Sequence, residues 1–292
     1  MKSSLRPRLM IAASMTVFGT IAIFVRAIPI SSAQLALCRA VIASVLIALF
    51  LLCSGQSLSF RGLGRELWLL LISGAAIGIN WILLFEAYRF TTVSVATLSY
   101  YFAPVIIILA CPILFREKMT AKKWLCFIMS TLGIVLITGL GDLSGGHSHI
   151  KGIAFGLAAA CLYAFAVLMN KFIKGVDGIR RTFLQFIAAV IVLLPYVLIS
   201  EGISFSAMDG RGWLMLAVVG AVHTGICYCL YFSGLKDTTG QEAAILSYAD
   251  PLVAVLCSVF ILGEAISLPQ ILGGVLILGF TLWNELGHPA KK

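Results

Sequence analysis

One acidic residue stands in the middle of an apolar run near the C-terminus, directly before a proline. The run is ILSYADPLVAV, residues 245–255, and its acid is Asp250. A carboxylate in such surroundings could bind a substrate ammonium group or carry a proton. It could also act only as a helix cap, because proline interrupts a helix and Asp before Pro suits the start of a new one. The sequence leaves both roles open.

Two further charged residues with suitable chemistry lie in apolar runs. The guanidinium of Arg39 suits a carboxylate or phosphate group of a substrate, or an internal ion pair with Asp250 or Glu86. Glu86 is itself a candidate for substrate binding, although Arg89 is close enough along a helix to neutralise it.

A histidine and a set of aromatic and amide residues complete the candidate site. His223 could relay protons because histidine titrates near neutral pH, and hydrogen-bonded packing is the alternative. Aromatic rings could enclose an ammonium group, although such rings at span ends often only anchor a protein in the interface. These further candidates are Asn80, Trp81, Tyr101, Tyr228 and Tyr248. No metal or cofactor is expected, since the eight cysteines form no CxxC pair and have no neighbouring histidine.

The elements that must position these residues are membrane spans. The 292-residue chain is 61% hydrophobic and 11% charged, whereas soluble domains contain about 25% charged residues. Apolar runs long enough to cross a bilayer predict an all-α integral membrane protein with ten transmembrane helices. The predicted spans are about 9–28, 32–53, 66–89, 92–115, 120–139, 151–173, 181–200, 211–235, 239–262 and 267–284.

The connecting loops predict the orientation of the chain. Most lysines and arginines fall in loops on one side, together with both termini. The positive-inside rule therefore predicts a multi-pass protein of the cell inner (plasma) membrane with both termini in the cytoplasm.

The chain also repeats itself at an offset of 147 residues. Thr91, Tyr101, Pro104 and Glu117 then align with Thr238, Tyr248, Pro251 and Glu264. Each unit contains an odd number of spans, so the second must be inverted, and a central cavity is expected between the units. The predicted repeats are residues 1–143 and 150–285, joined by GLGDLSGGHSHIK. Glu117 and Glu264 fall at span ends and are expected to cap or latch short loops.

The matching segments carry a family resemblance. SYYFAPVIIILACPILFRE and SYADPLVAVLCSVFILGE each contain a proline and a glutamate separated by twelve residues. Together with the repeat, they resemble the EamA-like branch of the drug/metabolite transporter superfamily. The resemblance implies that spans one to four and six to nine surround the cavity while spans five and ten stand outside. It also implies carriage of small metabolites, often amino acids and commonly by export.

These observations predict a secondary active transporter that works by alternating access. Its expected substrate is a small polar metabolite, an amino acid or related amine, and proton-coupled export is one form it could take. An organic-cation carrier, choline-like or drug-like, is the alternative. An intramembrane lipid-modifying enzyme is disfavoured because no His/Asp or Ser/His cluster is present, and no phosphate-binding loop indicates ATP. The expected partners are the substrate and the lipid bilayer, without nucleic acid, and a homodimer is compatible with the sequence.

Overall fold

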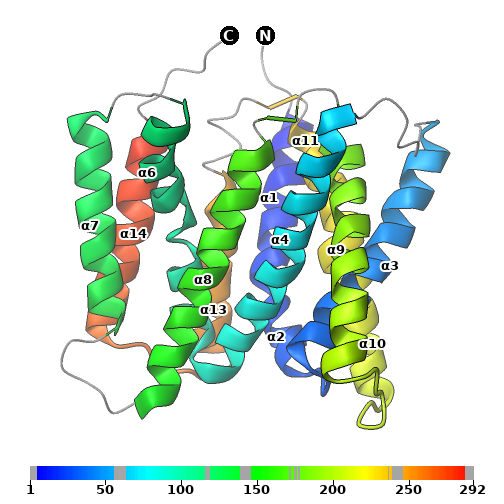
Figure 1. Cartoon of the computed structure of the whole chain (residues 1–292). Helices are drawn as coiled ribbons and strands as arrows, with labels where there is room; N and C mark the ends of the chain where they lie inside the picture. Colours follow the sequence, from blue (N-terminus) through cyan, green and yellow to red (C-terminus); the bar gives the residue numbers. More distant parts are fainter. Residues whose placement is uncertain are drawn as a thin grey trace.

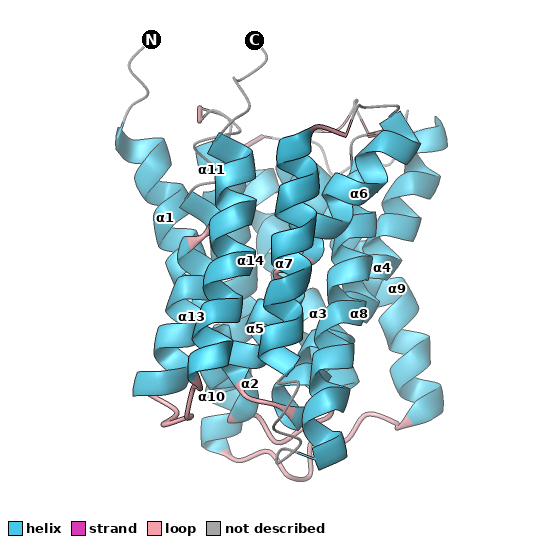
Figure 2. Ribbon diagram, turned by 90° about the vertical axis from the view of Figure 1, so that its left-hand side faces the viewer, coloured by secondary structure: helices cyan, strands magenta, loops and turns pink. Residues whose placement is uncertain are grey.

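The computed structural model describes a bundle of helices over residues 5–55, 64–115, 119–138, 146–170, 172–173, 176, 178–235, 237–238 and 246–286. Within these residues all regular structure is helical (Figure 2). Where the structure describes them, the ten predicted spans each fall on one helix or on consecutive helices. The predicted all-α membrane fold is therefore confirmed.

The first half of the chain provides five spans, two of which are interrupted. Its helices are α1 (Leu5–Gly19), α2 (Ile21–Arg26), α3 (Ser32–Cys53), α4 (Gly64–Phe90), α5 (Val93–Tyr100), α6 (Ala103–Phe115) and α7 (Ala121–Thr138). Short polar side chains cap the N-termini of α3 and α5. Ser31 accepts a hydrogen bond from the backbone N–H of Gln34, and Thr92 accepts one from that of Val95.

The second half provides the other five spans. Its helices are α8 (Gly146–Asn170), α9 (Gly178–Ser200), α10 (Gly210–Val218), the π-helix η2 (Val219–Ile226), α11 (Cys227–Leu235), α13 (Ala249–Phe260) and α14 (Leu268–Leu286). α10, η2 and α11 follow one another without a gap and form one long span.

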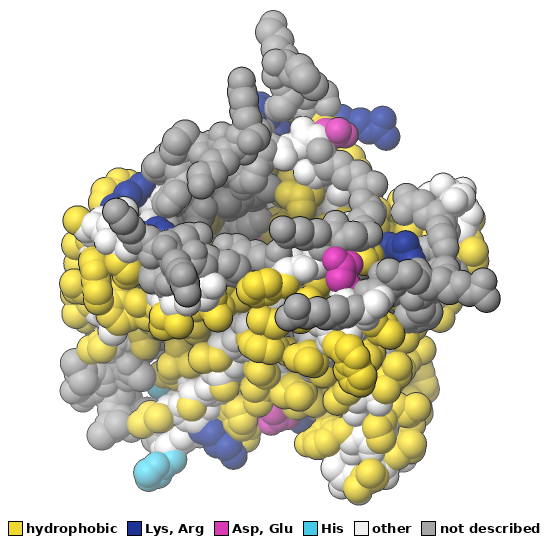
Figure 3. Space-filling view, turned by 45° about the horizontal axis from the view of Figure 1, so that its top comes forward, with side chains coloured by type: hydrophobic (Ala, Val, Ile, Leu, Met, Phe, Trp, Pro, Cys, Tyr) yellow, Lys and Arg dark blue, Asp and Glu magenta, His cyan; other side chains and the backbone are white. Residues whose placement is uncertain are grey.

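Length and composition are sufficient for membrane crossing in seven segments of the described chain. These are Leu5–Arg26, Ser32–Cys53, Glu66–Phe90, Val93–Ala110, His147–Asn170, Gly178–Ser200 and Gly210–Leu235, and Ala249–Phe260 and Leu268–Asn284 are shorter apolar helices. Hydrophobic side chains cover much of the visible flank in Figure 3. A surface of this kind suits hydrocarbon on the outside of the bundle.

The two halves enter the bundle from opposite ends (Figure 1). α1 starts at the upper end of the view, and α8, five spans later, starts at the lower end. The last described residues of α14 return to the upper end, close to the level at which α1 begins. Equivalent spans of the two halves therefore run in opposite directions.

Most of the helices surround a shared interior, while one pair stands to the side. α4 packs against α8 and α9, and α1 packs against α11 and α13, so each of these contacts joins the two halves. α7 and α14 pack mainly on each other and stand at the left of Figure 1. At their crossing a Cβ on Gly133 would lie 2.6 Å from the carbonyl oxygen of Gly273, so only glycine permits this approach.

The connection between the halves is shorter than the sequence predicts. α8 begins at Gly146, so the last residues of the predicted linker are helical. Two contacts with the C-terminal end of α4 stabilise the start of α8. His149 Nδ1 lies 2.7 Å from Thr91 Oγ1, and Lys151 Nζ lies 4.2 Å from the centre of the Phe90 ring. Glu117, which the repeat aligns with Glu264, lies outside the described residues.

Candidate functional site

A cavity of about 370 Å³ lies between the two halves of the chain. Side chains from α1 to α6 line it from the first half, and side chains from α8, α9, α11 and α13 line it from the second. Its lining includes seven of the residues predicted from sequence: Arg39, Asn80, Trp81, Tyr101, Tyr228, Tyr248 and Asp250. The structure thus gathers most of the candidates around one space.

Asp250 contributes a carboxylate to this cavity from the first turn of α13. The chain is interrupted at Tyr248, α13 starts at Ala249, and Pro251 follows within the first turn, where proline costs no helical hydrogen bond. Asp250 Oδ2 accepts a hydrogen bond of 2.6 Å from the hydroxyl group of Tyr101. The N-cap of α13 is Tyr248, so Asp250 lies within the first turn rather than at the cap position, and its described hydrogen-bond partner is a side chain of the other half.

The partner tyrosine occupies the corresponding interruption in the first half. Tyr101 lies in the turn between α5 and α6, and Tyr248 lies in the turn that precedes α13. The proline-associated breaks predicted in spans four and nine are therefore both present. Through Tyr101 and Asp250, the broken helices of the two halves meet at the cavity wall.

Arg39 contributes a buried cation from α3. Its side chain is among the buried charged groups, and its guanidinium carbon lies 4.3 Å from the centre of the Trp81 ring and 5.3 Å from that of Phe85. Arg39 Nε donates a hydrogen bond of 3.1 Å to Thr224 Oγ1. Within the described chain Arg39 forms no ion pair, so the predicted internal pair with Asp250 or Glu86 is absent from this structure.

Thr224, which accepts the hydrogen bond from Arg39, lies in the π-helix η2. Thr224 Oγ1 donates a hydrogen bond of 2.8 Å to the carbonyl oxygen of Val219, five residues earlier. The widened turn lies in the eighth span, and π-helical turns are frequent at functional sites. The π-helix in the eighth span thus positions the hydroxyl group that binds Arg39 at the cavity.

Neutral polar side chains form a third part of the lining. Asn80 Nδ2 donates to the carbonyl oxygen of Ala159 at 2.6 Å. Gln185 Nε2 donates to Ser73 Oγ at 2.7 Å and to Asn170 Oδ1 at 2.8 Å. Asn170 and Gln185 were not among the sequence candidates, although polar residues inside predicted spans gave a signal for both.

Aromatic rings occupy much of the remaining wall. Tyr228 makes edge contacts with Phe18 and Phe186, with ring centres 5.2 and 5.1 Å apart. The centre of the Tyr100 ring lies 6.0 Å from that of Tyr101 and 5.5 Å from that of Tyr163. Tyr100 and Tyr231 also line the cavity, together with Tyr88 and Tyr163, which the sequence did not single out. The space therefore offers a carboxylate, a guanidinium and a largely aromatic wall.

Two sequence candidates are absent from the cavity lining. His223 is buried, with Nε2 3.0 Å from Thr20 Oγ1, Nδ1 3.3 Å from the carbonyl oxygen of Val218, and its ring 4.7 Å from that of Phe24. These contacts correspond to the packing alternative. Glu86 forms an ion pair with Arg89 on the same helix, with 3.6 Å between Glu86 Oε1 and Arg89 Nη1. This is the neutralising pair that the sequence predicts as the alternative to substrate binding.

The sequence is similar to known transporter sequences over nearly its whole length. The model of the EamA-like transporter family matches residues 6–139 and again residues 150–284. The uncharacterized transporter YxxF of Bacillus subtilis (strain 168) is 31% identical over 265 residues, which cover 90% of this chain and 84% of the relative. Protein PecM of Dickeya dadantii (strain 3937) is 28% identical over 217 residues, or 72% of this chain and 71% of the relative.

A solved crystal structure shares the fold. It superimposes with a TM-score of 0.66 at 17% sequence identity, over 96% of each chain. At this identity the likeness concerns the fold alone. The family matches over both halves point to a membrane transporter rather than an enzyme, and the chain belongs to the EamA-like transporter family of the drug/metabolite transporter superfamily.

Proposed function

We propose that this protein is a secondary active transporter of a small polar metabolite that is zwitterionic, such as an amino acid. In this proposal Asp250 receives the ammonium group and Arg39 receives the carboxylate. The observation that carries it is the presence of both charged groups in the lining of one cavity between the two halves. Membership of a transporter family supports the wider part of the proposal.

A zwitterion suits this lining better than an ion of one sign. Charged groups inside a membrane protein are costly unless they are paired, and a zwitterion would compensate both Asp250 and Arg39. The aromatic wall would contact the apolar part of the substrate, and Trp81 already holds the Arg39 guanidinium in place by cation–π attraction. The volume of about 370 Å³ lies within the range of small-molecule sites.

The site also suits transport by alternating access. Inverted-repeat transporters bind their substrates near the membrane midplane between the repeats, beside broken helices. Tyr101 and Asp250 join the two halves at such breaks. We further propose that both termini face the cytoplasm of a cell inner membrane, that transport is export, and that Asp250 carries the coupling proton.

Thermal-shift measurements on the purified protein test the charge requirement. A panel of amino acids would be compared with the amine and the acid that each gives on losing its carboxylate or its ammonium group. A ligand that binds only the native state raises the apparent stability, so a matching amino acid should raise Tm more than its amine or its acid. An acid that raises Tm as much as its amino acid would contradict the role given to Asp250.

An organic-cation carrier is the second candidate function. The observation in its favour is the position of Asp250 beside Tyr101 in a cavity also lined by Tyr100, Tyr163 and Tyr248, because aromatic rings and a carboxylate together suit an ammonium group. In the same measurements such a carrier would respond to the amines as strongly as to the amino acids.

A further inference from the structure

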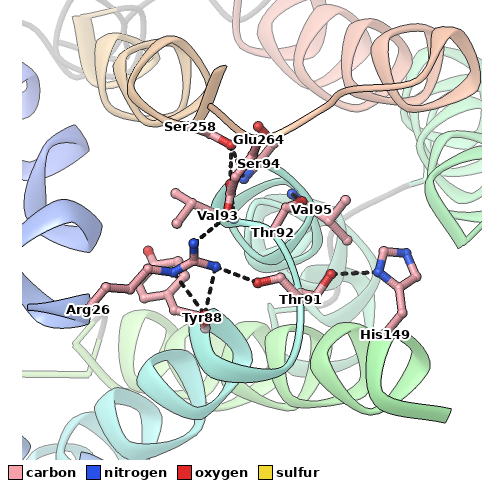
Figure 4. A network of polar contacts seen from close by, with 10 residues as sticks. All are labelled: Arg26, Tyr88, Thr91, Thr92, Val93, Ser94, Val95, His149, Ser258 and Glu264. Carbon is pink, nitrogen blue, oxygen red and sulfur yellow. Dashed lines mark hydrogen bonds and ion pairs between the residues drawn. The ribbon is translucent and has the colours of Figure 1, made fainter. Parts of the chain in front are cut away.

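A network of charged and polar contacts joins the two halves at the lower end of the bundle in Figure 1. Figure 4 shows its centre, an ion pair between Arg26 and Glu264. Arg26 is the last residue of α2 in the first half, and Glu264 lies in the loop between α13 and α14 in the second half. The pair therefore connects parts of the chain that belong to different repeats.

Arg26 also binds the end of the third span. Its Nε and Nη2 atoms donate hydrogen bonds of 3.1 and 2.9 Å to the carbonyl oxygen of Tyr88, and Nη2 donates one of 2.8 Å to that of Thr91. These carbonyl groups belong to the last turn of α4 and the residue just after it, where unpaired acceptors favour a cation. The guanidinium is thus held in position by backbone on one side and faces Glu264 on the other.

Glu264 receives donors from three elements. Besides Arg26, its carboxylate accepts a hydrogen bond of 2.8 Å from the backbone N–H of Val93 and another from Ser258 Oγ. The N–H of Val93 is one of the free donors at the start of α5, where a carboxylate is favourable. The Glu264 side chain is only 11% exposed, so this contact differs from a solvated surface salt bridge.

The network lies close to the cavity along the same helices. Thr97 lines the cavity four residues after Val93, which is about 6 Å of helical rise, and Ile21 lines it five residues before Arg26, about 7.5 Å. Asp250 and Ser258 are on the same helix, α13. An opening of the cavity toward this end would have to move α13 and its following loop away from α2 and α5.

We infer that the Arg26–Glu264 pair is the gate contact of this end: it breaks when the cavity opens here and forms again when the cavity closes. Water that enters would solvate the separated guanidinium and carboxylate, which offsets the loss of their mutual attraction. This inference goes beyond the proposed substrate, because alternating access requires each end to close whatever molecule is carried.

The accessibility of Thr97 tests the inference without a substrate. A Thr97→Cys thiol would be labelled with a membrane-impermeant maleimide in intact cells and in inverted membrane vesicles, and its peptide quantified by mass spectrometry beside the native cysteines. Adding Glu264→Gln removes the charge pair. We expect labelling about tenfold faster from the side that this network faces, since hydrogen bonds to charged groups contribute enough to shift the equilibrium by that factor. Labelling from the other side should not increase.

A second variant and a matched control complete the test. Arg26→Lys keeps the charge, but an ammonium group with three donors cannot reproduce the four hydrogen bonds of the planar guanidinium, so this variant should give a smaller increase in the same direction. Asp209→Asn removes an acid at the same end of the bundle, where it only caps α10, and Asn is an equal cap, so its labelling should match that of the parent. Unchanged labelling in both gate variants, or an equal increase in Asp209→Asn, would overturn the inference.

Discussion

Asp250 and Arg39 place opposite charges in the lining of one cavity, and each forms a hydrogen bond with a side chain of the other half of the chain. Tyr101 donates to the Asp250 carboxylate, and Thr224 accepts from the Arg39 guanidinium. Removal of either charge should therefore affect binding in a way that depends on the charges of the ligand.

Substitution of Arg39 should weaken the binding of ligands that carry a carboxylate. We expect Arg39→Ala to lower the affinity for an amino acid by roughly 10- to 100-fold, the effect of losing a hydrogen bond to a charged group. Arg39→Lys should also weaken binding, because lysine lacks the planar fork of the guanidinium. Titration calorimetry with an amino acid and its matched amine measures both effects. An Arg39→Ala variant that binds the amino acid as well as the parent does would favour the organic-cation alternative.

The sequence identified the charged part of the site better than its neutral part. An ionisable residue inside an apolar run is rare and costly, so the sequence alone identifies Asp250 and Arg39 as candidates. Asn170 and Gln185 were missed because a neutral polar side chain can satisfy its hydrogen bonds within helix packing. Which side of a helix faces the cavity depends on its neighbours, which the periodicity of a nearly uniform apolar span does not reveal.

At the scale of the elements, the broken helices depend on local sequence to different degrees. The breaks near Pro104 and Pro251 were predicted because proline interrupts helical hydrogen bonding. The interruption after Gly19 and the π-helix η2 were not predicted. η2 packs against α3, where a Cβ on Gly220 would lie 2.7 Å from side-chain atoms of Ile42. Its form therefore depends on a tertiary contact as well as on its own residues.

A close approach between α1 and α13 makes a prediction about stability. A Cβ on Gly19 would lie 2.5 Å from the carbonyl oxygen of Asp250, so Gly19→Ala should separate the two helices. Overpacking of this kind costs about 1–3 kcal/mol, and thermal denaturation of the purified variant should show a lower Tm.

Gly279→Ala in α14 is the matched control for this change. Within the described chain, no atom beyond the adjoining helical backbone lies within 4 Å of the position that its Cβ would take, so the substitution should leave Tm unchanged or raise it through better helix propensity. A Gly19→Ala protein as stable as the parent would show that α1 and α13 do not pack as closely as described.

At the scale of the whole molecule, the duplicated sequence and the odd number of spans in each unit predicted the inverted architecture. Loop boundaries were less accurate, because helices such as α8 extend beyond their apolar runs when tertiary contacts support the extra turn. The side of the membrane that each end faces remains a prediction from the distribution of lysine and arginine.

Labelling of two exposed loop residues tests this orientation. Ser206 lies between α9 and α10 at the lower end of Figure 1, and Ser54 follows α3 at the upper end. An impermeant maleimide applied to intact cells should label a Ser206→Cys thiol and leave a Ser54→Cys thiol unlabelled. The reverse pattern would place the termini outside the cell.

The most direct test of the proposed transport mechanism is the activity of an Asp250→Asn variant in proteoliposomes. The substrate would be the amino acid that gives the largest thermal shift with the unmodified protein, and uptake would be measured over a range of pH. Asparagine keeps the shape of the side chain and can still contact Tyr101, but it has neither charge nor a titratable group. We predict a protein that folds and inserts normally, loses most of its transport, and no longer responds to pH. Transport at the rate of the unmodified protein with the same pH profile would contradict the role of Asp250 in substrate or proton binding.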